Sequence, residues 1–481
     1  MIKRLITFFS FLVIVSFSCS DNNKLPDLTG SRLLNADLKE IRQRGRLIAV
    51  TDFNSTNYFI YKGEPMGFNY ELLKTFSDQA GIDLEIVTEN HIEHAIDMLN
   101  SGKADLIAMS ITVNGTRKKD IQFTESLDET RQMLVQRKPR NWRSMTAAAV
   151  DKSVIRNQLD LAGKTVYVQE GSTHGERLRT LAHEIGDSIT VVEVPYESEE
   201  LIKNVARGDI EYTVTDENIA RVNATYYPDI DINTPVSFPQ KLAWGVRKQN
   251  SEELLAELNR WISTFRKTED YAILYSKYFR NSRSGTMIRS DYYALSTGKV
   301  SKYDEIIRQF SDTINWDWRL LASLICQESR FDADVTSWAG AYGLMQVMPL
   351  TGERFGIDVT SSPKNNIRAG VMYINWLHTI FDPKIADEKE RLNFILASYN
   401  AGPGHVLDAM RLAGKNGKNP EKWADVEVWL QKKSDPKYYN DEVVKNGYFT
   451  GRESVAFVSQ ILDRYEHYRN ILPEGSDSQE K

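Results

Sequence analysis

Hydrophobic and polar positions follow one rhythm up to about residue 280 and a different one after residue 302. In the first part, short apolar runs with the length of buried strands are separated by stretches with helical spacing. The expected strands are Leu47–Val50, Leu84–Val87 and Ala104–Ser110, and the expected helices are Tyr70–Ala80 and Ile92–Asn100. This alternation predicts an α/β domain.

The second part has helical spacing, and one helix carries an acidic residue on its apolar face. Leu321, Leu324, Ile325 and Glu328 fall on one side of a helix, so the pattern that buries the first three turns Glu328 inward. Partial burial raises the pKa of a carboxyl group, which suits a general acid. A solvated glutamate at a helix end is the alternative for this helix taken alone.

The same patterns divide the chain into segments. Lys3 and Arg4 precede an apolar run that ends at Phe17 and is too short to span a membrane, which predicts an export signal. An apolar strand over Leu242–Val246 is expected to return to the first lobe of the α/β domain. The expected segments are a signal at 1–19, a tether at 20–38, the α/β domain at 39–280 with a second lobe at about 140–235, a linker at 281–302, the helical domain at 303–472 and a polar tail at 473–481.

Composition excludes some functions. The 481 residues suffice for two or three domains, and the net charge of -6 without a long basic run argues against nucleic-acid binding. Only Cys19 and Cys326 are present, so no disulfide framework is expected. Histidines do not occur at metal-site spacing, and we expect neither a metal nor another cofactor.

Four blocks of the helical part occur in a recognisable order. They are Gln327–Phe331, Ser337–Pro349, Asn366–Tyr373 and Ala397–Gly402. In order and spacing they resemble the lysozyme-like domain of soluble-type lytic transglycosylases, which cut the glycan strands of peptidoglycan. The closing segment, Lys437 to Val455, looks like the branch called membrane-bound lytic transglycosylase F.

The resemblance implies a mechanism with one carboxyl group. Glu328 would protonate the glycosidic oxygen between N-acetylmuramic acid and N-acetylglucosamine, and would then deprotonate the muramyl C6 hydroxyl, which closes a 1,6-anhydro ring. Residues that would bind the substrate are Ser337, Met345, Gln346, Tyr399 and Asn400. A lysozyme-type hydrolase and a peptidoglycan receptor without activity are the alternatives.

The first part also contains ordered blocks. They are Gly67–Leu73, Ala104–Thr112, Thr116–Lys119, Gly163–Thr173 and Val214–Asp216, and they resemble the extracellular solute-binding proteins for amino acids. The implied fold is a two-lobed α/β domain like a periplasmic binding protein, followed by the mainly α, lysozyme-like domain. The implied ligand is a small amino acid or cell-wall peptide, whose carboxylate Arg117 would grip and whose amino group Asp216 would bind. Further ligand contacts would come from Ser110, Thr112, Ser172 and Thr173.

Cys19 stands behind small residues at the end of the apolar run. This position resembles a bacterial lipoprotein site, at which Cys19 would be acylated. The implied location is the outer membrane, with the protein on the periplasmic side. An ordinary signal peptide with an incidental Cys19 is the alternative.

Overall fold

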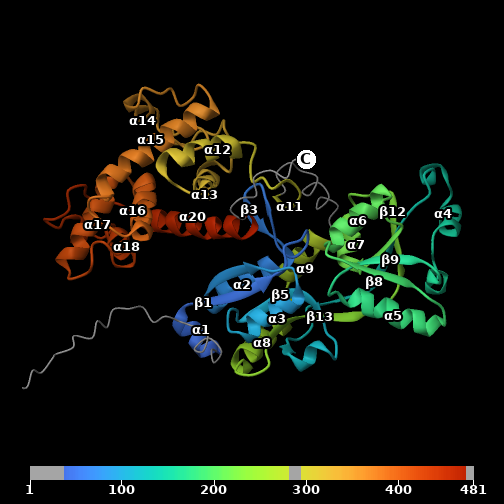
Figure 1. Ribbon diagram of the computed structural model, residues 1–481. Coiled ribbons are helices and arrows are strands. Elements are labelled where there is room, and N and C mark those ends of the chain that lie inside the picture. Colours follow the sequence, from blue (N-terminus) through green and yellow to red (C-terminus); the bar gives the residue numbers. More distant parts are fainter. Residues whose placement is uncertain (1–36, 281–293, 473–481) are drawn as a thin grey trace, which may run out of the picture.

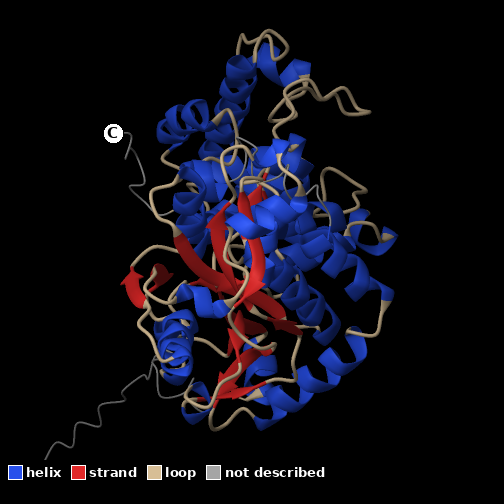
Figure 2. Ribbon diagram, turned by 90° about the vertical axis from the view of Figure 1, so that its right-hand side faces the viewer, coloured by secondary structure: helices blue, strands red, loops and turns tan. Residues whose placement is uncertain are grey.

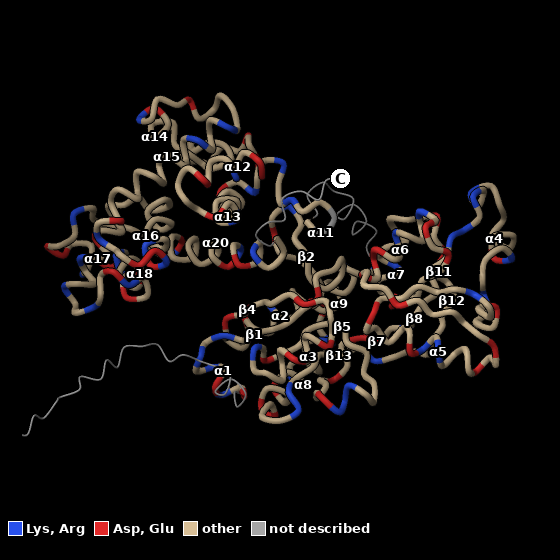
Figure 3. The backbone as a smooth tube through the Cα atoms, viewed as in Figure 1, with Lys and Arg blue, Asp and Glu red and all other residues tan. Residues whose placement is uncertain are grey.

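The computed structural model describes residues 37–280 and 294–472, which form a two-lobed α/β part and a helical part (Figure 1). The expected signal with Cys19, nearly all of the tether, much of the linker and the polar tail lie outside these residues. Among the described residues, no helix is long and apolar enough to cross a membrane. Acidic and basic residues are interspersed along both parts (Figure 3).

The first lobe is built on a mixed sheet with the order β4-β1-β5-β13-β6, and β7 also pairs with β13. The parallel strands β1 and β5 inside the sheet are largely apolar and buried, as expected for strands covered by helices, whereas β4 at the edge is more polar (Figure 2). The expected return strand is confirmed, because β13 runs antiparallel to β5. The elements of this lobe are α1 (Leu38–Arg44), β1 (Arg46–Thr51), β2 (Phe59–Tyr61), β3 (Glu64–Met66), α2 (Phe68–Ala80), β4 (Asp83–Thr88), α3 (Ile92–Asn100), β5 (Leu106–Thr112), β6 (Ile121–Phe123), β7 (Asp128–Thr130), β13 (Gln240–Arg247), α8 (Glu252–Phe265) and α9 (Glu269–Tyr275).

The second lobe has its own sheet, with the order β10-β9-β11-β8-β12. Because β8 pairs with β11 and β12, this lobe begins near residue 132 rather than near residue 140. The chain crosses between the lobes directly from β7 into β8, so no turn sequence marks the boundary. The elements are β8 (Gln132–Arg137), α4 (Ala147–Ser153), β9 (Thr165–Gln169), α5 (Thr173–Ile185), β10 (Thr190–Val194), α6 (Ser198–Arg207), β11 (Tyr212–Asp216), α7 (Glu217–Ala224) and β12 (Ile230–Pro235).

The last part is mainly helical, and its α13 packs against α12 and α20. Leu321, Leu324 and Ile325 on α13 are fully buried, as the helical spacing predicted. The helices are α11 (Ala294–Thr297), α12 (Asp304–Ser311), α13 (Trp318–Ser329), α14 (Pro349–Arg354), α15 (Pro363–Phe381), α16 (Glu388–Ala401), α17 (Pro403–Lys415), α18 (Trp423–Lys432), α19 (Pro436–Tyr439) and α20 (Arg452–Ile471).

Both ends of α13 are fixed by local chemistry. Asp317 caps its first turn by accepting a hydrogen bond from the backbone N–H of Arg319. At the other end Arg330 and Phe331 both have positive φ, 51° and 62°, a conformation that costs free energy for residues with a side chain. The chain therefore leaves the helix abruptly, just after Glu328.

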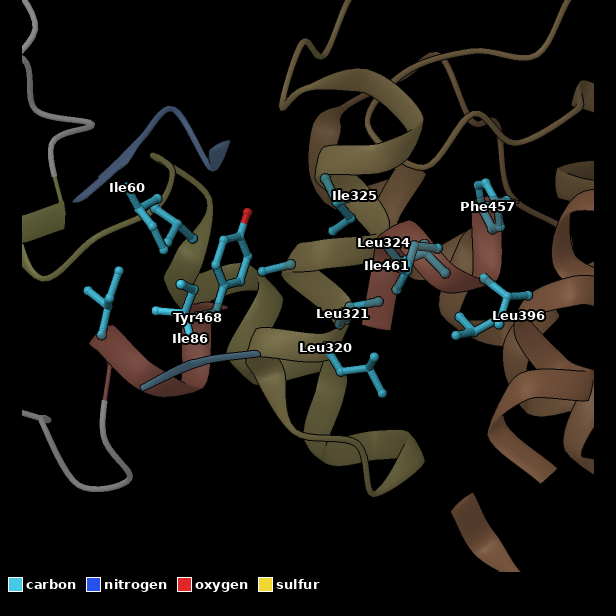
Figure 4. Close-up of a cluster of buried hydrophobic side chains, with 14 of the residues drawn as sticks. Ile60, Ile86, Leu320, Leu321, Leu324, Ile325, Leu396, Phe457, Ile461 and Tyr468 are labelled. Carbon is cyan, nitrogen blue, oxygen red and sulfur yellow. The ribbon is translucent and has the colours of Figure 1, made fainter. Parts of the chain in front are cut away.

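The two parts share one hydrophobic core. Helix α20 extends from the helical part to the first lobe, where Tyr468 lies beside Ile60 and Ile86 (Figures 1 and 4). The Tyr468 hydroxyl donates a hydrogen bond of 2.7 Å to the backbone oxygen of Gly63, at the tip of the β2–β3 hairpin. The Asn470 side chain in turn donates to the backbone oxygen of Ile86 over 2.6 Å.

The tip of the β2–β3 hairpin also contacts the end of α13. A Cβ atom built on Gly63 would lie 2.6 Å from the Phe331 ring and 2.8 Å from Cys326 Sγ. The neighbouring Glu64 forms an ion pair with Arg464 of α20 at 3.3 Å. Through Cys326, the hairpin of the first lobe therefore contacts α13 two residues before Glu328.

Candidate active site

Glu328 occupies the last turn of α13, where its carboxyl group is only partly exposed. Burial raises its pKa from an ordinary value near 4.5 to about 8, and no neighbouring charge contributes to the shift. At neutral pH this carboxyl group is therefore protonated. Such a group can donate a proton to a leaving oxygen.

The raised pKa has a consequence for stability. Between pH 4.5 and about 8 the folded protein holds a proton on Glu328 that the unfolded chain releases, so the free energy of unfolding falls as pH rises through this range. We expect Glu328→Gln to remove this penalty. In thermal unfolding, its stability relative to the wild type should increase by on the order of a few kcal/mol between pH 5 and pH 9.

Asp332→Asn is the matched control, because Asp332 is an exposed carboxylate four residues further along. Its difference from the wild type should be the same at both pH values. Parallel stability curves for Glu328→Gln and the wild type would contradict the burial of a protonated carboxyl group.

Tyr399, at the end of α16, is near enough to Glu328 to interact with its charge. Burial and then the charge of Glu328 raise the pKa of its phenol. The hydroxyl donates to the backbone oxygen of Met345 over 2.8 Å, and the ring lies 5.5 Å from the Tyr373 ring. The adjacent Asn400 accepts a hydrogen bond of 2.6 Å from Ser454 on α20. Three helices therefore hold this side of the site.

The segment between α13 and α14 contacts Tyr399 through the backbone oxygen of Met345. Asn366 binds it from α15, because its side chain accepts from the backbone N–H of Met345 at 2.8 Å and donates to the backbone oxygen of Tyr342 at 2.7 Å. Gly343 is required here, since its φ is +75° and a Cβ atom would lie 2.6 Å from the Asn366 amide.

The predicted substrate residues of this segment have different surroundings. The Ser337 hydroxyl accepts from the backbone N–H of Ala341, and the Gln346 amide donates to the backbone oxygens of Val335 and Gly343. Both side chains are partly exposed and hold the turns of the segment. Met345 differs from the expected cleft-lining position, because its side chain is fully buried against Gly370. It offers its backbone oxygen to Tyr399 instead.

The α/β part contains a second candidate site. A cavity of about 820 Å³ lies between its two lobes, and all six of the predicted ligand residues line it. They are Ser110, Thr112, Arg117, Ser172, Thr173 and Asp216. Burial lowers the pKa of the Arg117 guanidinium, while the carboxylates of Glu93 and Asp216 nearby oppose that shift.

Sequence reasoning missed an acidic group in the same cavity, formed by Asp52, Glu197 and Glu199. Burial raises the pKa of Asp52 to about 6, and the charges of the two glutamates add to the rise. Glu199 of the second lobe accepts a hydrogen bond of 3.0 Å from the backbone N–H of Ser55 in the first lobe. These residues are far apart in the chain, so no local motif joins them.

His174 also lines this cavity. It is 6% exposed, and its Nε2 lies 3.6 Å from Asp216 Oδ1. Its Nδ1 has no hydrogen-bond partner within the described part of the chain. The only local signal for His174 in the sequence is its position in the first turn of a helix, α5.

Residues 305–422 match the family of the transglycosylase SLT domain, and residues 46–281 match the bacterial extracellular solute-binding proteins, family 3. Together with the two sheets and the helical part, these matches confirm the predicted fold class.

Two curated relatives cover nearly the whole chain, and both are named membrane-bound lytic murein transglycosylase F. The relative from Desulfosudis oleivorans is 34% identical over 89% of this chain and 91% of its own. The relative from Pseudomonas fluorescens is 30% identical over 89% of this chain and 86% of its own. Among solved structures, an ancestral arginine-binding protein bound to arginine has a TM-score of 0.42 at 26% identity, over 49% of this chain and 99% of that one.

Proposed function

Because the chain belongs to the membrane-bound lytic murein transglycosylase F family, we propose that Glu328 cleaves peptidoglycan as both acid and base, with no second carboxylate. The protein is a peptidoglycan lytic transglycosylase with a solute-binding domain before its catalytic domain. The observation that carries the proposed role is the pKa of Glu328, which burial alone raises to about 8.

A single protonated carboxyl group fits an intramolecular reaction. Hydrolytic glycosidases generally use two carboxyl groups, of which the second is a nucleophile or activates water. Among the described residues, no second carboxylate perturbs the pKa of Glu328. A reaction in which the substrate supplies its own nucleophile needs only this one carboxyl group.

The proposed reaction transfers one proton through Glu328 and replaces one C–O bond at muramyl C1 by another. Glu328 donates its proton to the glycosidic oxygen as the bond from muramyl C1 breaks, and the muramyl N-acetyl group stabilises the positive charge at C1. The Glu328 carboxylate then takes the proton of the C6 hydroxyl as O6 bonds to C1. The products are a free N-acetylglucosamine hydroxyl and a 1,6-anhydro-N-acetylmuramic acid end, and no water is consumed.

Supporting roles follow from the contacts. Tyr399 and Asn400 are held by Met345 and Ser454, so we propose that they orient the muramyl sugar against Glu328. Ser337 and Gln346, which are partly exposed, would also bind the sugar. The backbone oxygen of Met345 fixes Tyr399. We propose this indirect role for Met345 in place of the direct substrate contact that the sequence predicted.

Digestion of purified peptidoglycan with the full chain tests the reaction. Mass spectrometry of the released muropeptides should show anhydro ends, which are lighter than hydrolysis products by one water. Reducing muramyl ends would mean a hydrolase. Binding of peptidoglycan without any product would support the receptor alternative.

For the cavity of the α/β domain we propose a small amino acid or cell-wall peptide as ligand. Arg117 would bind its carboxylate and Asp216 its ammonium group, with hydrogen bonds from the four hydroxyl side chains. The acidic group of Asp52, Glu197 and Glu199 favours a ligand with a second cationic group. The domain would sense this ligand and regulate the catalytic domain.

The pKa of Asp52 makes this proposal measurable by calorimetry with L-lysine as the probe. Asp52 is neutral below pH 6 and charged above it, so the affinity for lysine should increase about tenfold from pH 5 to pH 7. Asp52→Asn should flatten this dependence. L-leucine is the matched control and should show little change, whereas equal pH dependence for both amino acids would exclude a role for Asp52.

The relatives are named membrane-bound, and peptidoglycan is a substrate of the cell envelope, so the enzyme acts there. We propose that the signal directs export and that acylated Cys19 anchors the protein to the periplasmic side of the outer membrane. Labelling with a palmitate analogue that persists in a Cys19→Ala variant would exclude this anchor.

A further inference from the structure

A basic segment projects from the second lobe, at the end of the molecule opposite the helical part (Figure 1). It leaves the sheet after β8, contains the short helix α4 and returns at Arg156, whose guanidinium binds Asp231 of β12. Residues 137–156 contain six Lys or Arg and one Asp, so they carry a net charge of +5. The whole chain carries -6, so the rest of it carries -11.

The first turn of this segment is built around Trp142. The backbone N–H of Trp142 donates to the backbone oxygen of Pro139 at 3.0 Å, and its indole N–H donates to Asp229 Oδ1 at 2.7 Å. Lys138 Nζ lies 4.3 Å from the centroid of the indole ring, and the guanidinium carbon of Arg143 lies 4.9 Å from it. Both cations therefore lie over one fixed aromatic ring.

Two positive charges of this turn remain available to an external anion. Arg140 is exposed and forms no ion pair within residues 37–280 and 294–472. Lys138 is partly exposed and donates to the backbone oxygen of Pro228 at 2.8 Å, which uses one of the three donors of its ammonium group. Arg143 differs, because it is paired with Asp229 at 3.0 Å.

Small apolar side chains follow directly after these cations. Met145 is partly exposed, and Ala147–Ala149 at the start of α4 are all exposed. A tryptophan beside basic and apolar side chains suits the boundary between lipid headgroups and acyl chains, where tryptophan is enriched. A soluble polyanion would need the cations alone.

We propose that the turn of Lys138, Arg140 and Trp142 docks on a membrane surface that is rich in anionic phospholipid. Lipid phosphates would bind Lys138 and Arg140, and Trp142 would lie at the level of the headgroups. The same surface repels the charge of -11 on the rest of the chain, which favours one orientation. The helical part, at the opposite end, would then be directed away from the membrane. This inference goes beyond the proposed reaction and requires no acylation of Cys19.

Sedimentation with vesicles of phosphatidylglycerol and phosphatidylcholine tests this contact. The chain without residues 1–19 retains every described residue, and neither the apolar run nor an acyl chain can then contribute. It should bind these vesicles but not phosphatidylcholine alone, and high salt should weaken the binding. Each Lys or Arg at an anionic surface contributes about fivefold to affinity, so Lys138→Gln combined with Arg140→Gln should weaken binding about 25-fold.

Arg140→Glu is a second variant, which removes the same amount of charge and leaves the contacts of Trp142 in place. It should also weaken binding about 25-fold. The matched control combines Lys103→Gln with Lys267→Gln, at two exposed lysines of the first lobe, and should bind like the wild type. An equal loss in this control would overturn the docking surface, because the attraction would then depend on total charge alone.

Purified peptidoglycan provides the competing outcome, since its peptides also carry carboxylates. Sedimentation with this polymer is measured in a Glu328→Gln background, so that the proposed reaction cannot degrade it. Arg140→Glu should leave this binding unchanged. A loss as large as the loss on vesicles would make the segment a wall-binding surface and overturn the membrane contact. Vesicle binding that depends on Arg140 supports the contact whether or not the wild type forms anhydro products.

Discussion

Glu328→Gln is expected to release no detectable anhydromuropeptides from purified peptidoglycan. Glutamine has nearly the size of glutamic acid but can neither donate a proton to the leaving oxygen nor accept one from the C6 hydroxyl. General acid–base catalysis contributes roughly 10²–10⁴-fold to a rate, and here one group provides both steps. Initial rates of product release, measured by mass spectrometry, should fall by about that factor or more.

The matched control is again Asp332→Asn, at the exposed turn after α13. It should retain wild-type rates, because the proposed reaction needs no second carboxylate. A Glu328→Gln rate within about tenfold of the wild type would refute the acid–base role. Loss of activity in Asp332→Asn alone would instead indicate a two-carboxylate hydrolase.

The second large effect is expected at the tip of the β2–β3 hairpin, in Gly63→Ala. The added Cβ would lie 2.6–2.8 Å from Phe331, Tyr468 and Cys326, which is too close for any packed side chain. Overpacking of this kind costs about 1–3 kcal/mol. The contact between the two domains should open or distort, and thermal unfolding should show the loss.

Gly45→Ala provides the control for backbone strain. Gly45 has a φ of 80°, against 79° for Gly63, but no atom lies within 4 Å of the position that an added Cβ would take. The difference between the two variants therefore isolates the steric effect, and Gly63→Ala should be less stable by about 1–3 kcal/mol. Equal stability would mean that the hairpin moves aside without cost.

Much of the fold followed from local pattern. The strand expected at Leu47–Val50 is the core of β1, and the helix expected at Ile92–Asn100 has those bounds. The burial of Leu324 beside a half-buried Glu328 followed from helical spacing, because both residues face the same neighbours.

Features that depend on distant partners could not be predicted. Lys433 stands in a polar run and looks like a surface charge, yet Asp408 and His405 surround it across 25 and 28 residues. Asp52 and Glu199 meet only when the two lobes approach each other. Hydrophobic periodicity records how apolar a position is, and it contains no information about which charges pair in space.

The position of Cys326 makes its thiol a probe of the contact between the two domains. Its thiol lies under the hairpin that joins the two domains, 3.7 Å from Glu64, and burial raises its pKa to about 11. A thiol reacts as the thiolate, so Cys326 should react only slowly with alkylating reagents while the domains are in contact. Since Cys19 is the only other cysteine, alkylation of a protein acylated there would report any opening of this contact.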